Sequence, residues 1–102
     1  MSVMVVTKFN VPASTLEELV NDRHRETVLQ LREAGVAAGA IRHVFAEDTD
    51  GNLMVVDEWP SEEAFQAFFA SQPAIQQLMA DAGVTNPPTT TTYRILASPD
   101  RI

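Results

Sequence analysis

Residues 40–65 read AIRHVFAEDTDGNLMVVDEWPSEEAF and contain the elements that decide the fold. Two runs rich in β-branched and aromatic residues, 40–47 and 53–59, flank an Asp-Gly pair at 50–51 that is typical of a tight hairpin turn. We therefore expect these runs to be antiparallel neighbouring strands. Ser61 then has the character of a helix N-cap, and the two glutamates after it suit the positive end of the helix dipole.

The segment before the hairpin predicts a strand followed by one long helix. Residues 2–9, SVMVVTKF, lack Gly and Pro and are rich in β-branched side chains, as in a strand. Ser14 and Glu17 have the spacing of a capping box, in which the Ser hydroxyl accepts from a free backbone N–H and the Glu reaches back. Apolar residues then recur on one side of a helix that we expect to end at Gly35.

The segment after Ser61 predicts a helix, an interruption, a second helix and a strand. A proline is tolerated in the first turn of a helix but not in the interior of a helix. The SQP run at 71–73 therefore breaks or restarts the helix. The second helix is expected to end at Gly83. Residues 89–96, TTTTYRIL, then form a last strand, because β-branched residues fit a sheet well.

The element order is strand, helix, strand, strand, helix, strand. Right-handed crossovers in each strand-helix-strand unit put both helices on the same face of one four-stranded antiparallel sheet. The fold class is therefore α+β, with the ferredoxin-like βαββαβ plan. A chain of 102 residues should form a single domain, residues 1–102.

The strands carry apolar residues on both faces. In the runs at 2–9 and 53–59, apolar side chains occupy odd and even positions alike, although a half-buried strand should alternate. The helices can cover only one face. The apolar residues left on the other face are Met4, Val6, Met54 and Val56. We expect a homodimer in which two sheets pack face to face; the alternative is that these side chains are tolerated singly in water.

Composition excludes several classes of partner. The net charge of −7 would repel phosphate backbones, so nucleic acid is not expected to bind. No apolar run approaches the ~20 residues that cross a bilayer, and no membrane partner is expected. The absence of cysteine suits a cytoplasmic location, and two distant histidines without a cysteine cluster predict no metal site.

Three short motifs carry a family resemblance: DEW at 57–59, SEEAF at 61–65 and ASQP at 70–73. With the element order, they resemble the antibiotic biosynthesis monooxygenase-like group of the dimeric α+β barrel superfamily, over about Val3 to Leu96. The resemblance implies a homodimeric barrel with a pocket between sheet and helices in each subunit. Members include cofactor-free oxygenases of polycyclic phenols and haem-degrading enzymes. Phe68 stands where members often carry a His, and no iron ligand is in place, so haem degradation is disfavoured.

The resemblance directs attention to a general base. A cofactor-free oxygenase must deprotonate an electron-rich aromatic substrate so that the anion can reduce O₂, and histidine is the usual base. His24 lies on the apolar side of the expected long helix, beside polar Arg23 and Thr27, which is typical of a pocket wall. We take His24 as the candidate catalytic residue. The alternative is a structural histidine bonded to a backbone carbonyl or to Asp57.

Other side chains are candidates for substrate contact. Trp59 and Tyr93 join an apolar ring to a hydrogen-bond donor; the alternatives are that Trp59 fills the core at the end of its strand and that Tyr93 lies at the barrel rim. His43 shares a strand face with apolar residues and belongs either to the pocket or to the dimer interface. The expected substrate-binding residues are Asn10, His43, Trp59, Phe65, Phe68 and Tyr93.

The sequence thus supports two functions. The first is a cofactor-independent monooxygenase, with no bound cofactor or metal, that acts on a small apolar or aromatic, phenolic or polyketide-like substrate. The second is a non-catalytic homodimer that binds a small molecule or acts as a scaffold. Fold alone cannot choose between them, since one fold hosts many functions.

Overall fold

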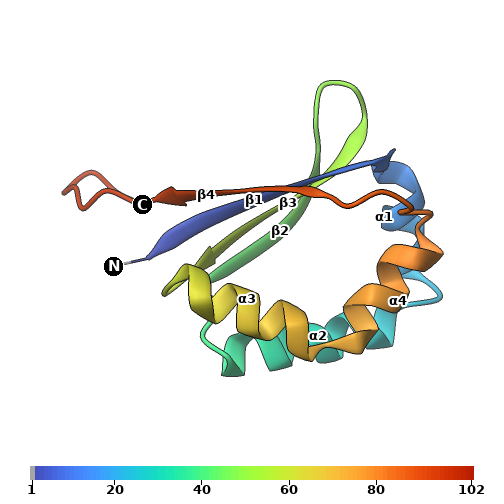
Figure 1. The fold of residues 1–102 in the computed structure, drawn as a ribbon, viewed down its shortest axis with the longest axis horizontal. Coiled ribbons are helices and arrows are strands. Elements are labelled where there is room, and N and C mark those ends of the chain that lie inside the picture. Colours follow the sequence, from blue (N-terminus) through green and yellow to red (C-terminus); the bar gives the residue numbers. More distant parts are fainter. Residues whose placement is uncertain (1) are drawn as a thin grey trace.

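The computed structural model describes residues 2–102, and its architecture is α+β and ferredoxin-like. A four-stranded antiparallel sheet in the order β2-β3-β1-β4 carries helices on one face only (Figure 1). The fold predicted from the sequence is therefore confirmed. The elements are β1 (Val3–Pro12), α1 (Ala13–Asn21), α2 (Arg25–Ala37), β2 (Arg42–Glu47), β3 (Asn52–Trp59), α3 (Glu62–Ser71), α4 (Pro73–Asp81) and β4 (Thr89–Arg94).

The central hairpin forms as its turn residues dictate. The Asp48 carboxylate accepts the backbone N–H groups of Asp50 and Asn52 at 2.9 and 3.0 Å, which closes the turn. Gly51 has φ of 80°, a conformation that glycine adopts without strain. The strands then pair in register, with Phe45 opposite Val55.

The prediction of a single long helix before the hairpin is wrong. The chain forms α1 and α2, separated by a turn at 22–24 in which the N–H groups of Asp22 and His24 both donate to the Leu19 carbonyl. The predicted stop at Gly35 is also wrong, because α2 continues to Ala37 and the positive φ that ends the segment belongs to Gly39, at 109°.

The predicted capping box at Ser14 and Glu17 is also wrong, because the helix has a different N-cap residue. Strand β1 extends to Pro12, which is the N-cap of α1 and has no side chain that can cap. The N–H of Ala13 instead donates to the Gly51 carbonyl at 2.9 Å, so the hairpin turn satisfies the start of α1. Glu17 is consequently not used as a cap.

The predicted start of α3 is confirmed. The Ser61 hydroxyl accepts the backbone N–H of Ala64 at 3.1 Å, and Glu62 and Glu63 lie in the first turn. Pro73 begins α4, as the sequence indicated for a proline in a first turn.

We predict that Ser61→Ala lowers the free energy of unfolding by about 1 kcal/mol, because the N–H of Ala64 loses its acceptor. Urea denaturation followed by circular dichroism measures the change. Ser14→Ala is the matched control, since no side chain caps α1, and it should leave stability nearly unchanged. Equal losses in the two variants would contradict the assignment of the cap.

The core lies between the inner face of the sheet and the helices. Leu16 of α1 and Leu53 of β3 are each 1% exposed, and Leu78 and Met79 of α4 close the same cluster. Burial of such side chains supplies most of the stabilisation of a domain this size.

The other side of the sheet has no helix over it (Figure 1). Val56 pairs with Val6 on one side and Val44 on the other, so these three side chains form a row across the strands. Met4, Val44 and Tyr93 are 36%, 47% and 49% exposed. We name as the open face the residues Met4, Val6, Val44, Met54, Val56 and Tyr93. No helix among residues 2–102 is long and apolar enough to cross a membrane.

Candidate functional site

His24, the predicted catalytic base, lies in the turn between α1 and α2. Its Nε2 is 2.7 Å from Asp81 Oδ2 at the end of α4, and Arg23 Nη2 is 3.2 Å from the same oxygen. The break in the helix separates His24 from the apolar stripe on which the sequence placed it. His24 lines neither of the two cavities described below, and the same is true of His43. This geometry favours a structural role for His24, with Asp81 as its partner rather than Asp57.

The His24 contact has an electrostatic consequence at Asp81. The hydrogen bond from His24, followed by those from Gln77 and the charge of Arg23, holds the pKa of the Asp81 carboxyl below its ordinary value of 3.8. A carboxyl with a lowered pKa in the folded state stabilises the fold above its unfolded pKa. That contribution is lost as the pH falls through the folded pKa.

We therefore expect Asp81→Asn to make the fold less sensitive to acid. The measurement is the urea midpoint of each protein between about pH 6 and pH 2, a range that spans ordinary carboxyl titration. The wild-type midpoint should fall more steeply on acidification than that of the variant. Asp22→Asn is the control, because the Asp22 side chain is exposed in the neighbouring turn. A wild-type slope retained in Asp81→Asn would contradict the expectation.

His43 and Asp57 form a second imidazole–carboxylate pair, on the inner face of the sheet. They are register partners on β2 and β3, and His43 Nδ1 lies 2.6 Å from Asp57 Oδ1. The Asp57 side chain is 11% exposed, whereas that of His43 is 48% exposed. A carboxylate at Nδ1 selects the tautomer with the proton there, so Nε2 of the neutral ring carries the lone pair. This arrangement can accept a proton from a bound molecule.

Trp59 ends β3 on the same inner face. It is 3% exposed and packs against the rings of Phe65 and Phe68, with centroids 6.1 and 5.4 Å away. Its indole Nε1 is buried and has no hydrogen-bond partner among residues 2–102. A buried donor normally has an acceptor, so this N–H could serve an oxygen of a bound molecule.

Asn10 and Tyr93 lie away from this group. Asn10 is exposed between buried Phe9 and Val11, so it points to the side of the sheet opposite the helices. Tyr93 pairs with Met4 on the open face. Within one copy, the structure brings together His43, Trp59, Phe65 and Phe68 on the inner face, and it separates from them His24, Asn10 and Tyr93.

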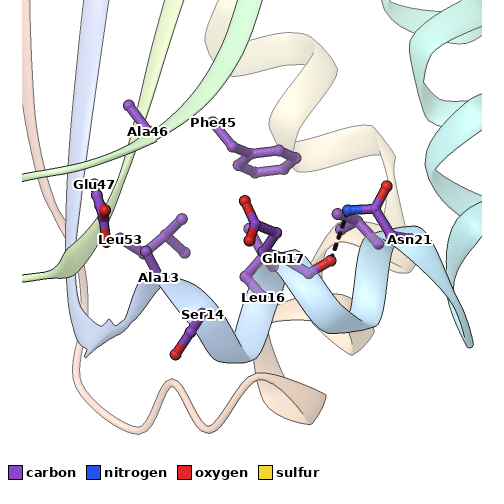
Figure 2. A pocket seen from close by; sticks show the side chains of 10 residues that line it. Ala13, Ser14, Leu16, Glu17, Asn21, Phe45, Ala46, Glu47 and Leu53 are labelled. Atoms are coloured by element: carbon purple, nitrogen blue, oxygen red, sulfur yellow. Dashed lines mark hydrogen bonds between the residues drawn. The ribbon is translucent and has the colours of Figure 1, made fainter.

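One cavity is a groove of about 480 Å³ between α1 and the edge strand β2, which we name the edge groove (Figure 2). The buried side chains of Leu16 and Leu53 lie in it, and Phe45 forms its wall toward His43, whose ring meets that of Phe45 edge-on at 4.8 Å. A smaller pocket of about 180 Å³, the α3 pocket, lies beside Phe65 and Phe69 and includes Thr7.

None of the residues that the sequence singled out as catalytic or substrate-binding lines the edge groove, and two carboxylates are among the residues that do. Glu17 and Glu47 line it, one from each wall. The capping-box interpretation assigned Glu17 to the helix start. For Glu47, alternation with His43 and Phe45 along β2 was the available signal, since the three share a face.

Glu58 is the buried carboxylate on the opposite side of the sheet. It is 4% exposed, accepts from Ser2 Oγ at 2.7 Å and from Arg101, and lies 3.8 Å from Arg42 Nε. Arg101 first, then Ser2, lower the pKa of the Glu58 carboxyl. The C-terminal segment is thereby held beside the open face. Residues 2–102 contain no group of three side chains suited to hold a metal ion.

The fold, with its helices on one face of the sheet, is similar to that of solved antibiotic biosynthesis monooxygenase-like proteins. Comparison with solved structures confirms this resemblance over nearly the whole chain. A monooxygenase from the gene ActVA-Orf6 of Streptomyces coelicolor, solved with the ligand nanaomycin D, is 25% identical with a TM-score of 0.60, over 95% of this chain and 92% of that chain.

Two further structures extend the comparison at the level of the fold. SnoaB, a cofactor-independent oxygenase from Streptomyces nogalater, is 14% identical with a TM-score of 0.57, and the match covers 98% of each chain. A dimeric ferredoxin-like protein from an uncultured marine organism is 16% identical with a TM-score of 0.61, over 99% of this chain and 92% of that chain. No protein-family model and no curated protein matches the chain.

Proposed function

We propose that the protein is a cofactor-independent monooxygenase that oxidises a small apolar or aromatic substrate in the edge groove, with His43 as the general base. The observation that carries this proposal is the His43–Asp57 pair, a half-exposed imidazole held by a nearly buried carboxylate; His43 does not line the edge groove itself, but its ring contacts Phe45, which does. His43 takes the role that the sequence suggested for His24. The activities named for the ActVA-Orf6 protein and SnoaB support the same reaction class.

The chemistry requires only a base, O₂ and exclusion of water. His43 Nε2 removes a proton from a phenol or from an activated CH₂ group, and Asp57 stabilises the imidazolium that forms. The carbanion or phenolate transfers electrons to O₂ and a carbon–oxygen bond forms. For a CH₂ substrate, one oxygen atom becomes the product carbonyl, and the other leaves as water with the two hydrogens. Substrate is oxidised and O₂ is reduced, so no external reductant is needed.

The Trp59 indole N–H is a further polar group on the inner face of the sheet, outside the lining of the edge groove. It is a buried donor without a protein acceptor, surrounded by phenylalanine rings. An oxygen atom of the substrate or of O₂ that reached this inner region would accept a hydrogen bond from the indole N–H. The bond would add more binding free energy than one to a solvent-exposed donor, because the buried N–H is shielded from water.

The proposal includes a homodimer formed through the open face. A row of valines flanked by Met4 and Tyr93 is left without cover in one copy, and contiguous apolar surface of this kind marks an interface. A second copy presents the same apolar surface, as an isologous contact requires. The dimeric ferredoxin-like neighbour supports this assembly. Tyr93 then contributes to the interface rather than to the groove of its own subunit.

The test is O₂ consumption with anthrone-type and phenolic compounds, in buffer with a chelator and without flavin. With ¹⁸O₂, the product should gain one labelled oxygen atom and the second should appear in water. Heat-denatured protein measures spontaneous oxidation. O₂ uptake no faster than this background across the compound panel would overturn the enzymatic proposal.

A second candidate function is binding without catalysis. The α3 pocket favours it, because the side chains that line this pocket include no acid or base. Trp59 is the only tryptophan of the chain and packs on Phe65, which lines the same pocket, so its fluorescence should report occupancy. A fluorescence change with the same compounds, without O₂ uptake, would select this function.

A further inference from the structure

The edge groove combines an apolar floor with two acidic walls. Leu16 and Leu53, each 1% exposed, give the floor, and the Phe45 ring gives one side (Figure 2). Such a surface suits the flat body of an aromatic or alicyclic molecule, because apolar contact there removes hydrocarbon from water on both partners.

The two acidic walls are Glu17 on α1 and Glu47 on β2. In Figure 2 the Glu17 carboxylate extends from α1 toward the Phe45 ring. Neither carboxylate forms a hydrogen bond or ion pair with another side chain in the described part of the chain, unlike Asp57, Glu58 and Asp81. Asn21, the neighbouring amide, is already engaged, since its Nδ2 donates to the Glu17 carbonyl at 2.8 Å.

We infer that the edge groove selects a molecule with a flat apolar body and a protonated amine. Two carboxylates without protein partners on opposite walls attract a cation, and an aromatic ring beside one of them adds a cation–π contribution. The net charge of −7 adds a long-range attraction of the same sign. An anionic or phosphorylated ligand would meet repulsion from both walls. This inference rests on the proposed function only in taking the groove as the place where the substrate binds.

The test compares two probes that share one body, 1-naphthylmethylamine and 1-naphthalenemethanol. Isothermal titration calorimetry at low salt should give tighter binding of the amine by about fivefold, since each exposed ion pair changes affinity by up to about fivefold and two carboxylates line the groove. The double variant Glu17→Gln/Glu47→Gln should bring the two affinities together. Added salt should do the same in part, because exposed charges are screened.

Glu33→Gln is the matched control, because Glu33 is an exposed carboxylate on α2 outside the groove. It should preserve the preference for the amine. Equal affinities for amine and alcohol in the wild type, binding of neither probe, or an equal loss in Glu33→Gln would each overturn the inference. Circular dichroism of each variant verifies the fold.

The outcome is separable from that of the oxygenase proposal. Selective amine binding without O₂ consumption would leave the cation site intact and remove the enzymatic function. O₂ consumption with neutral phenols, unaffected by the two glutamine substitutions and with no preference for amines, would leave the function intact and remove the cation site.

Discussion

His43→Ala is expected to lower the rate of O₂-dependent turnover by about 10²- to 10⁴-fold, the usual contribution of a general base. The imidazole contacts Phe45 of the edge groove and is held by a nearly buried carboxylate. Its half-exposed position means that its removal leaves no core cavity. The loss should appear in kcat more than in KM, since proton removal belongs to the chemical step.

Two variants separate a base from a structural contact. Asp57→Asn keeps the size of the side chain but no longer stabilises an imidazolium, so it should also slow turnover. His24→Ala should leave the rate close to that of the wild type, because His24 pairs with Asp81 outside the groove. Full activity in His43→Ala, or loss of activity in His24→Ala alone, would return the role of base to His24.

Val56→Asp is expected to convert a dimer into single subunits. Val56 lies in the middle of the open face, between Val6 and Val44 on the neighbouring strands. Symmetry would bring two new carboxylates into one apolar interface, and an unpaired ion loses several kcal/mol of solvation there. A cost of this size raises the dissociation constant by about a thousandfold or more.

Analytical ultracentrifugation measures the result. The wild type should sediment as a dimer and Val56→Asp as a chain of 11.2 kDa. Val36→Asp is the control, because Val36 is 58% exposed on α2, on the helical side of the sheet. It should remain dimeric. A wild-type protein that sediments as a stable monomer would refute the proposed interface and the claim that a second copy covers the open face.

Local patterns in the sequence determined the plan of the fold. The hairpin needed only Asp50-Gly51 between two β-prone runs, and the start of α3 needed only Ser61 followed by glutamates. These signals act within a few residues, through turn conformations and backbone N–H groups that any tertiary context must satisfy. The apolar pattern on both faces of the strands was equally visible, because side chains alternate along a strand in every sheet.

The identity of the candidate site depended on the tertiary structure. Helical periodicity ran through residues 22–24 without revealing a break, so it placed His24 on a face that the folded chain does not form. The role of each histidine then depended on a carboxylate partner distant in sequence: Asp81 is 57 residues from His24, and Asp57 is 14 residues from His43. Glu17 is left free to line the groove because Pro12, not Ser14, is the N-cap of α1. Periodicity specifies a face, but only the packing of helices on the sheet specifies which polar groups on those faces come within bonding distance.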